Sequence, residues 1–408
     1  MSIKKYLRDY AEADIEFARH LQQNWQHVLC VPAFDEKDAL PRFLASVLSE
    51  QGLLIILLIN SPQSAENTAA ADRTRLSATT LKQQYPLLKI ISEHCNLLQF
   101  NSRGSHLLVV ERYALPDKEG VGLARKIACD LACKLIHEKK VLSPWIHNTD
   151  ADVILPDNYF KISQQLETDI AAALFAFKHE ANPDAGLQHG LQLYEFSLYY
   201  YVEALLWAGS PYAFHTVGST LLIHHNAYAL SRGFPKRSAG EDFYLLNKLA
   251  KIGKIHSLKE PYITLSGRSS ARVPFGTGPA ITKINAIQQP ELNYLYYHPQ
   301  CFLHLKEWLG LMPTLWETGD LQKTLDSGLL LDCLTELGVE AAIAHALQHS
   351  KSQASFVKHM HNWFDAFRTL KLIHCLRNRK LRSINKNSLQ ALQNEFVFIE
   401  SAAQALSD

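Results

Sequence analysis

The sequence predicts an α/β protein in which helices flank a mostly parallel sheet, followed by an α-helical C-terminal region. Short apolar runs alternate with helix-like segments over about the first 290 residues, which is typical of a parallel sheet covered on both faces. From residue 294 onward the pattern is helical, with few β-branched runs. The 408 residues are 47% hydrophobic and 20% charged. At ~150 residues per domain, this length and composition predict a folded protein of two domains.

The N-terminal half supplies the first strands of this sheet. Residues 2–24 are expected to form an amphipathic helix, because apolar residues from Tyr6 to Leu21 recur at near-helical spacing. An apolar run stopped by Pro32 is expected to be the first strand. The next elements are expected to be a helix over 39–50, a strand over 53–59, a helix over 65–84 and strands over 87–92 and 107–112.

A glycine-led helix and further strands follow. Gly120-Val121-Gly122 opens a segment with apolar residues four apart from Leu123 to Leu135, and the run WIHN is expected to be a strand. Helices are expected over 159–168, over 188–208 and from GEDF onward, and strands over 170–177 and at TVGSTLLIHH. We therefore expect an N-terminal helix packed on the body (1–27), a sheet domain (28–290) and a helical domain (291–408).

Charge and targeting signals favour a cytoplasmic protein. The 41 Lys and Arg balance the 40 Asp and Glu, so the net charge of +1 gives no reason to expect a nucleic-acid partner. The longest aliphatic run has seven residues, against about 20 for a membrane span. The charged N-terminus does not resemble a secretory signal, and seven cysteines suit reduced thiols better than a disulfide framework.

One C-terminal segment departs from this charge balance. Between Asp365 and Glu395 the chain has seven basic residues and no acidic one. We expect either a solvated helix face or a surface that contacts an anionic membrane or a phosphate-bearing acceptor, because each basic residue near such a membrane contributes about 1 kcal/mol.

Polar residues follow three of the expected strands. Asp35-Glu36, Asn60 and Asp150 stand where those strands end. In an open α/β sheet, ligands bind at the carboxyl ends of the strands. This coincidence indicates a binding site at that edge.

Asp150-Ala151-Asp152 adds a metal candidate. The two carboxylates alternate along an extended segment, and Mg²⁺ favours one or two carboxylates together with substrate phosphates. An acidic turn after a strand is the alternative interpretation of this D-x-D pattern.

Four segments in order resemble the GT-A type nucleotide-sugar glycosyltransferases, in particular the family 2 group. VLCVPAFDE is similar to the family's first strand and following turn, and GVGLARKIA to its glycine-led helix. IHNTDADVILPDNYF resembles the strand with the D-x-D, and VGSTLLIHHNAYALSRGFPKRSAGEDFYLLNKLAKIGKI the acceptor-side stretch with its Glu-Asp pair. The resemblance covers about residues 28–275, so the last hundred residues lie outside it.

The resemblance implies a GT-A (Rossmann-like) fold and transfer of a hexose from a UDP- or GDP-sugar to a sugar, lipid or small-molecule acceptor, assisted by Mg²⁺ or Mn²⁺. Asp242 would be the base of an inverting reaction beside Glu241, and Asp152 and Asp150 would hold the metal. The implied donor-binding residues are Pro32, Ala33, Phe34, Glu36, Asn60, Gly122, Arg125 and Asp150, and the implied acceptor residues include Gly218 and Ser219.

Several alternatives stay open. Glu241 and Asp242 could have no catalytic role and merely cap a helix. The reaction could also be retaining. Where the family usually has Asp-Asp or Asp-Gly-Ser, this chain has Asn60-Ser61-Pro62. An amide still donates and accepts hydrogen bonds, so the change is expected to alter specificity, although it also keeps open a silent nucleotide- or sugar-binding protein. A sugar nucleotidyltransferase is disfavoured because no G-x-G-x-R loop follows the first strand.

Two further sets of residues are candidates. Arg268 and Arg272 stand beside a Gly-x-Gly turn and could form a diphosphate-binding lid, with a solvated surface loop as the alternative. Tyr201 and Trp207 belong to an aromatic helix that could contact the acceptor, although aromatic residues at helical spacing more often form a core.

Overall fold

The computed structural model describes residues 1–167, 169–268, 276–325 and 328–407, and its chain divides into two compact units. The first unit contains the described residues of 1–181 and 216–267, and the second contains those of 182–215 and 276–408, together with Arg268. This division differs from the expected boundary at residue 290. The helix α5 (Ala185–Trp207) belongs to the second unit because its apolar residues pack among the C-terminal helices.

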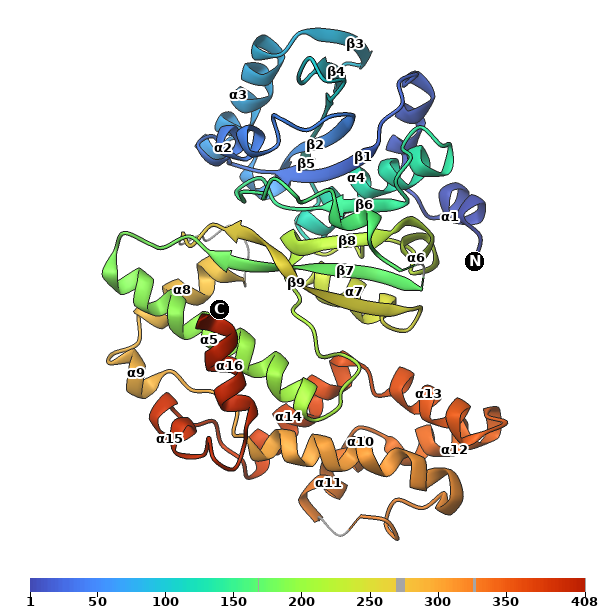
Figure 1. Cartoon of the computed structure of the whole chain (residues 1–408), viewed down its shortest axis with the longest axis vertical. Helices are drawn as coiled ribbons and strands as arrows, with labels where there is room; N and C mark the ends of the chain where they lie inside the picture. Colours follow the sequence, from blue (N-terminus) through green and yellow to red (C-terminus); the bar gives the residue numbers. More distant parts are fainter. Residues whose placement is uncertain (168, 269–275, 326–327, 408) are drawn as a thin grey trace. The chain divides into compact units, whose positions relative to one another are not determined.

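The first unit is built on one sheet. Among the described residues, nine strands pair in the order β3-β4-β5-β2-β1-β6-β8-β7-β9 (Figure 1). Strands β1, β2, β3, β5, β6, β7 and β9 run in one direction, and β4 and β8 run in the other. The mixed α/β fold with a mostly parallel sheet is therefore confirmed. The strands are β1 (His27–Ala33), β2 (Leu53–Pro62), β3 (Leu87–Ser92), β4 (Cys95–Gln99), β5 (His106–Leu115), β6 (Trp145–Asn148), β7 (Ile170–His179), β8 (Leu221–His224) and β9 (Lys254–Leu265).

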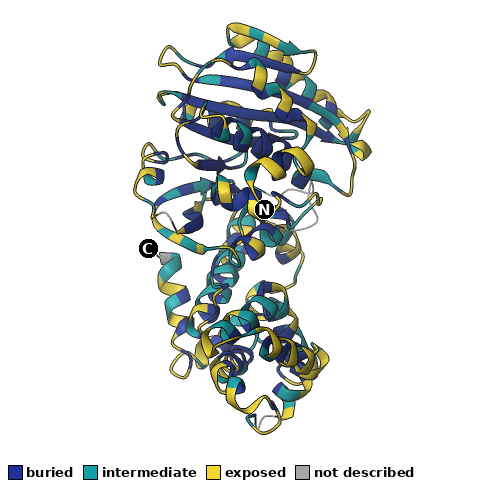
Figure 2. Ribbon diagram, turned by 90° about the vertical axis from the view of Figure 1, so that its right-hand side faces the viewer, coloured by how far each residue is buried: buried dark blue, intermediate teal, exposed yellow. Residues whose placement is uncertain are grey.

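The centre of this sheet is fully buried, as Figure 2 shows by colour. Every residue of β1 is buried, and in β2 only the last residue is partly exposed. These strands read as continuous aliphatic runs because a parallel sheet is covered on both faces. The helices of this unit are α1 (Ile3–Asp9), α2 (Ala39–Ser46), α3 (Ala69–Gln84), α4 (Gly120–His137), α6 (His225–Leu230) and α7 (Glu241–Leu249). Helix α4 packs on β1, β2 and β6 and is buried along most of its length.

Some elements differ from the sequence expectations. The segment 2–24 contains the short helix α1 and a separate 3₁₀ segment, Ala13–His20. Helix α1 lies against α4 and α6. Of the segment expected to be helical over 159–168, the described residues 159–167 contain only a 3₁₀ turn, Ile162–Gln164. Strands β4 and β9 were not expected, since the first is short and the second carries many exposed polar residues.

The second unit is helical, as expected for the C-terminal region. Besides α5, it contains α8 (Thr277–Asn285), α9 (Pro290–Asn293), α10 (Gln300–Thr318), α11 (Gly328–Glu336), α12 (Val339–His349), α13 (Gln353–Trp363), α14 (Ala366–Arg379), α15 (Lys386–Ala391) and α16 (Phe398–Ser407). Its core gathers large residues such as Trp308, Phe302 and Phe356, all fully buried. No helix in the described part of the chain is long and apolar enough to span a membrane.

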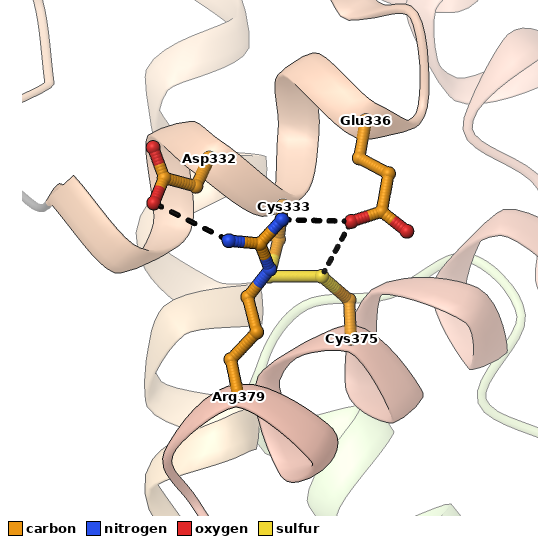
Figure 3. Close-up of a disulfide and its surroundings, with 5 residues drawn as sticks. All are labelled: Asp332, Cys333, Glu336, Cys375 and Arg379. Atoms are coloured by element: carbon orange, nitrogen blue, oxygen red, sulfur yellow. Dashed lines mark hydrogen bonds and ion pairs between the residues drawn. A yellow bond between two sulfur atoms is a disulfide. The ribbon is translucent and has the colours of Figure 1, made fainter.

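A disulfide joins two helices of the second unit. Cys333 of α11 and Cys375 of α14 are bonded, with their Cα atoms 5.8 Å apart (Figure 3). Arg379 of α14 binds Glu336 of α11 at 3.0 Å beside the bond. The expectation that the cysteines are reduced therefore does not hold for this pair, because the two helices bring residues far apart in the sequence into contact.

We predict that Cys375→Ser lowers the free energy of unfolding by ~2–4 kcal/mol, because the bond closes a chain segment with a sequence separation of 42. Denaturant unfolding with and without a reductant measures the effect. The reductant should destabilise the wild type and leave Cys375→Ser unchanged. Equal stability of the oxidised and reduced wild type would contradict the prediction.

Candidate active site

Three parallel strands bring polar residues to one edge of the sheet. Strand β1 lies between β2 and β6 and runs parallel to both, so their carboxyl ends share one edge. Asp35 follows β1, Asn60 lies near the end of β2, and Asp150 follows β6. The backbone N–H of Thr149 donates to the carbonyl of Cys30 at 3.1 Å, which extends the pairing up to the D-x-D. The structure therefore places these polar residues along one edge, and the binding site expected there stays a prediction.

Arg125 connects the D-x-D to the Glu-Asp pair. It comes from the first turns of α4, and its side chain is only 4% exposed. Its Nη2 donates to Asp150 at 2.6 Å, and its Nε donates to Glu241 at 2.9 Å. Burial opposes the charged form, but the neighbouring carboxylates outweigh it and hold the pKa of Arg125 above its usual value. The structure thus brings together three of the residues that the sequence singled out.

Asp242 lies beside this ion pair at the start of α7. The N-cap of α7 is Gly240, with φ of 70°, so neither acidic residue stands at the N-cap position. The carboxylate of Asp242 accepts from the backbone N–H of Phe243 at 2.7 Å. Burial and then the charge of Glu241 raise the pKa of Asp242 to about 7, against the opposing effects of that hydrogen bond and of Arg125. A carboxyl group that titrates near neutral pH suits general acid–base catalysis.

Gly218 lies against Arg125 and Asp242, just before β8. It precedes β8, whose antiparallel pairing with β6 puts the start of β8 at the same edge. A Cβ at Gly218 would lie 2.6 Å from Nη2 of Arg125 and 3.5 Å from Oδ2 of Asp242. The side-chain amide of Asn148 donates to the carbonyl of Gly218 at 2.8 Å. Asn148 was not among the site residues predicted from the sequence. Its place two residues before Asp150, at the end of β6, could have indicated it. The neighbouring Ser219 is buried.

The glycines that open α4 make a close contact with the chain before α7. A Cβ at Gly122 would lie 2.4 Å from the carbonyl oxygen of Pro235, and one at Gly120 would lie 2.7 Å from Cα of Ser238. The backbone N–H of Gly122 donates to the carbonyl of Arg237 at 2.9 Å. This close packing is enough to explain why glycine stands at both positions, so it gives no evidence for a ligand. The nucleotide contact of Gly122 stays a prediction.

The D-x-D residues differ in their surroundings. The side chain of Asp150 is 36% exposed and paired with Arg125. Asp152 is partly buried and has contacts of its own within the chain. Across the described residues, no group of three or more His, Cys, Asp or Glu side chains is arranged to hold a metal ion. Because Mg²⁺ takes one or two carboxylates and completes its shell with phosphates and water, two aspartates still fit such an ion.

The other expected donor residues lie at the ends of β1 and β2. Pro32 and Ala33 are buried in β1, Phe34 is partly exposed and Glu36 is buried. Between the last two, the carboxylate of Asp35 accepts two hydrogen bonds from Arg73 of α3, at 2.6 and 2.7 Å.

Asn60 has an unsatisfied polar atom. Its side chain is 7% exposed, and its Oδ1 has no hydrogen-bond partner within the described structure. A buried acceptor without a partner favours a ligand contact there.

The remaining predicted residues are less informative about this edge. Arg268 is partly exposed, whereas Arg272 and most of the predicted lid lie outside the described residues. Tyr201 contacts the rings of Tyr297 and Phe302. Trp207 stacks against Phe398 and lies under the ammonium group of Lys306. These contacts belong to the core of the helical unit and account for both aromatic residues, so their acceptor role stays a prediction.

The basic segment of the helical unit is partly neutralised. Arg379 pairs with Asp332 and Glu336 of α11. Lys371, Lys380 and Arg382 are exposed, and in the described part of the chain no carboxylate pairs with them. The predicted contact with an anionic membrane surface stays a prediction.

Comparisons with known proteins add little to this geometry. No family model matches the chain, and no curated protein sequence matches it. Among solved structures, the chain is similar to S. aureus TarS 1–349, with 10% identity, coverage of 84% of this chain and 91% of the other, and a TM-score of 0.35. The same protein in complex with UDP-GlcNAc gives a TM-score of 0.37 at the same identity and coverage. These values assign no family, so the functional argument depends on the site.

We predict that Asp242→Asn stabilises the protein at pH 8 by ~1–3 kcal/mol. The unfolded Asp242 ionises near pH 3.8 and the folded one near pH 7, so wild-type stability falls as pH rises between these values. Asparagine keeps the acceptor for the Phe243 N–H and carries no charge. Denaturant unfolding at pH 5 and pH 8 should show a larger gain at pH 8. A gain that does not change with pH would contradict the raised pKa.

Proposed function

We propose that this protein is a glycosyltransferase that moves a sugar from a nucleoside-diphosphate donor to an acceptor hydroxyl, with inversion at the anomeric carbon. The observation that carries the proposal is the position of Asp242, a carboxyl group with a pKa near 7, beside Arg125 and the D-x-D at the carboxyl edge of the sheet. This edge is where open α/β sheets bind ligands. The four sequence segments that resemble family 2 transferases supply the residues of this group.

The chemistry needs a base and a way to stabilise the leaving diphosphate. Asp242 would accept the proton of the attacking hydroxyl, and its raised pKa makes it a stronger base than an ordinary carboxylate while leaving it partly ionised near neutral pH. Asp152, with Asp150 as a second carboxylate, would hold Mg²⁺ or Mn²⁺, which supplies positive charge to the departing diphosphate. The unsatisfied Oδ1 of Asn60 would accept a hydrogen bond from the base or ribose of the donor.

Two other functions compete with this proposal. A retaining transferase would use the same donor site without Asp242 as a base, and the configuration of the product, measured by NMR, separates the two. The other candidate is a catalytically inactive nucleotide- or sugar-binding protein. It is favoured only by Asn60, which stands where the family usually has an aspartate. Binding without turnover in the presence of Mn²⁺ would support it.

We predict that Asp242→Asn lowers the turnover number by ~100-fold or more and changes donor affinity little, because asparagine cannot accept the proton of the hydroxyl. The wild-type rate should rise with pH through about 7 as Asp242 loses its proton. The assay measures nucleoside diphosphate released from a panel of UDP- and GDP-sugars. Asp157→Asn, which removes an exposed carboxylate nearby, is the control. A wild-type rate for Asp242→Asn would refute the assignment of the base.

We also predict that UDP or GDP binds at least ~10-fold more tightly with Mg²⁺ or Mn²⁺ than with a chelator, and that Asp152→Asn abolishes this difference, because the variant loses a carboxylate ligand. Calorimetric titration measures both affinities. Asp157→Asn removes the same charge from the same segment and should keep the metal dependence. Equal wild-type affinity with metal and with chelator would count against the metal site.

A further inference from the structure

Each of the three guanidinium nitrogens of Arg125 has a partner in the chain itself. Its Nε binds Glu241, its Nη2 binds Asp150, and its Nη1 lies 3.5 Å from the carbonyl oxygen of Thr149. The side chain is 4% exposed, and that of Glu241 is 6% exposed. A phosphate group would have to displace one of these carboxylates to reach the guanidinium. The family resemblance implies that Arg125 binds the donor, whereas in the structure its guanidinium binds groups of the chain itself.

The three partners come from two separate parts of the fold. Asp150 and Thr149 follow β6, Glu241 opens α7, and Arg125 belongs to α4. The planar guanidinium presents its N–H groups in fixed directions, so it can bind two carboxylates at once in one geometry. A lysine ammonium in the same place would keep the charge, but it would lack this fixed fork.

Gly218 restricts the position of the guanidinium from the opposite side. A Cβ at this position would lie 2.6 Å from Nη2 of Arg125, which is closer than real Cβ atoms approach, and 3.1 Å from Cζ, which is a tight contact. The carbonyl of Gly218 is itself held by Asn148, two residues before Asp150. An alanine at position 218 would therefore displace the arginine without changing any charge.

We propose that Arg125 is a positioning residue that fixes the D-x-D segment against the start of α7, and that Gly218 is the contact that fixes Arg125. The inference rests on the proposed function, because it concerns the distance between the donor-side carboxylates and Asp242. Arg125 sets that distance and does not bind the donor. A small displacement of such groups costs a large factor in rate, whereas donor binding depends on other contacts.

The test uses the full chain and compares Arg125→Lys and Gly218→Ala with the wild type. Gly310→Ala is the matched control, because no atom lies within 4 Å of the added Cβ. Turnover of UDP- and GDP-sugars gives the turnover number, and calorimetry with UDP and GDP plus Mg²⁺ gives the dissociation constant. Both variants should lose at least ~10-fold in turnover number while the dissociation constant changes by less than about 3-fold, and Gly310→Ala should match the wild type.

Other combinations of turnover number and dissociation constant overturn the proposal. A weaker dissociation constant with an unchanged turnover number in Arg125→Lys would identify Arg125 as a donor ligand. Unchanged turnover in Gly218→Ala would show that the close contact has no influence on the reaction. If Gly218→Ala does not fold, the result for Arg125→Lys decides alone.

A second measurement separates this inference from the proposed function. Denaturant unfolding of the two single variants and the double variant needs no activity. Because both substitutions disturb one contact, the double variant should be about as stable as the less stable single variant. Additive losses would overturn the positioning contact even in an active transferase. If the wild type turns over no nucleotide sugar, the proposed function fails, and the unfolding result still decides whether the contact exists.

Discussion

The candidate site depends on one buried cation. Arg125 is almost fully removed from water, and such a charge is tolerated only where oppositely charged and hydrogen-bonding groups surround it. Asp150 and Glu241 supply these charges from two different elements. Their pairing with Arg125 holds the end of β6 and the start of α7 together, and it places Asp242 next to three charged groups. The raised pKa of Asp242 follows from burial and from this crowding of carboxylates.

The sheet decides which residues can take part in the site. Since β1, β2 and β6 are neighbours and parallel, residues more than a hundred positions apart reach one edge. The antiparallel strand β8 then returns the chain so that Gly218 stands beside Arg125. At Gly122 a Cβ would lie 2.4 Å from a backbone oxygen, so glycine is required there, and at Gly218 a Cβ would lie 2.6 Å from the end of the Arg125 side chain.

The sequence predicted the parts of this arrangement that depend on local pattern. Continuous aliphatic runs identified β1 and β2, and polar residues after them identified the edge, because both signals lie in a few adjacent residues. Sequence alone could not show that Arg125 pairs with Asp150 and Glu241, since that pairing depends on how distant elements meet. The disulfide of Cys333 and Cys375 was missed for the same reason. Trp207 and Tyr201 were proposed as acceptor contacts from their type and spacing, which do not distinguish a binding surface from the helical core that contains them.

Thermal unfolding with a panel of nucleoside diphosphates asks whether this edge binds the leaving group of the proposed reaction. The panel consists of UDP, GDP, CDP and ADP, each with and without Mg²⁺. We expect one of them to raise the melting temperature in the presence of Mg²⁺, since a ligand at ~100 times its dissociation constant adds about 2.7 kcal/mol of stability. The increase should be smaller without Mg²⁺. An unchanged melting temperature with every nucleotide at millimolar concentration, with and without metal, would contradict the account.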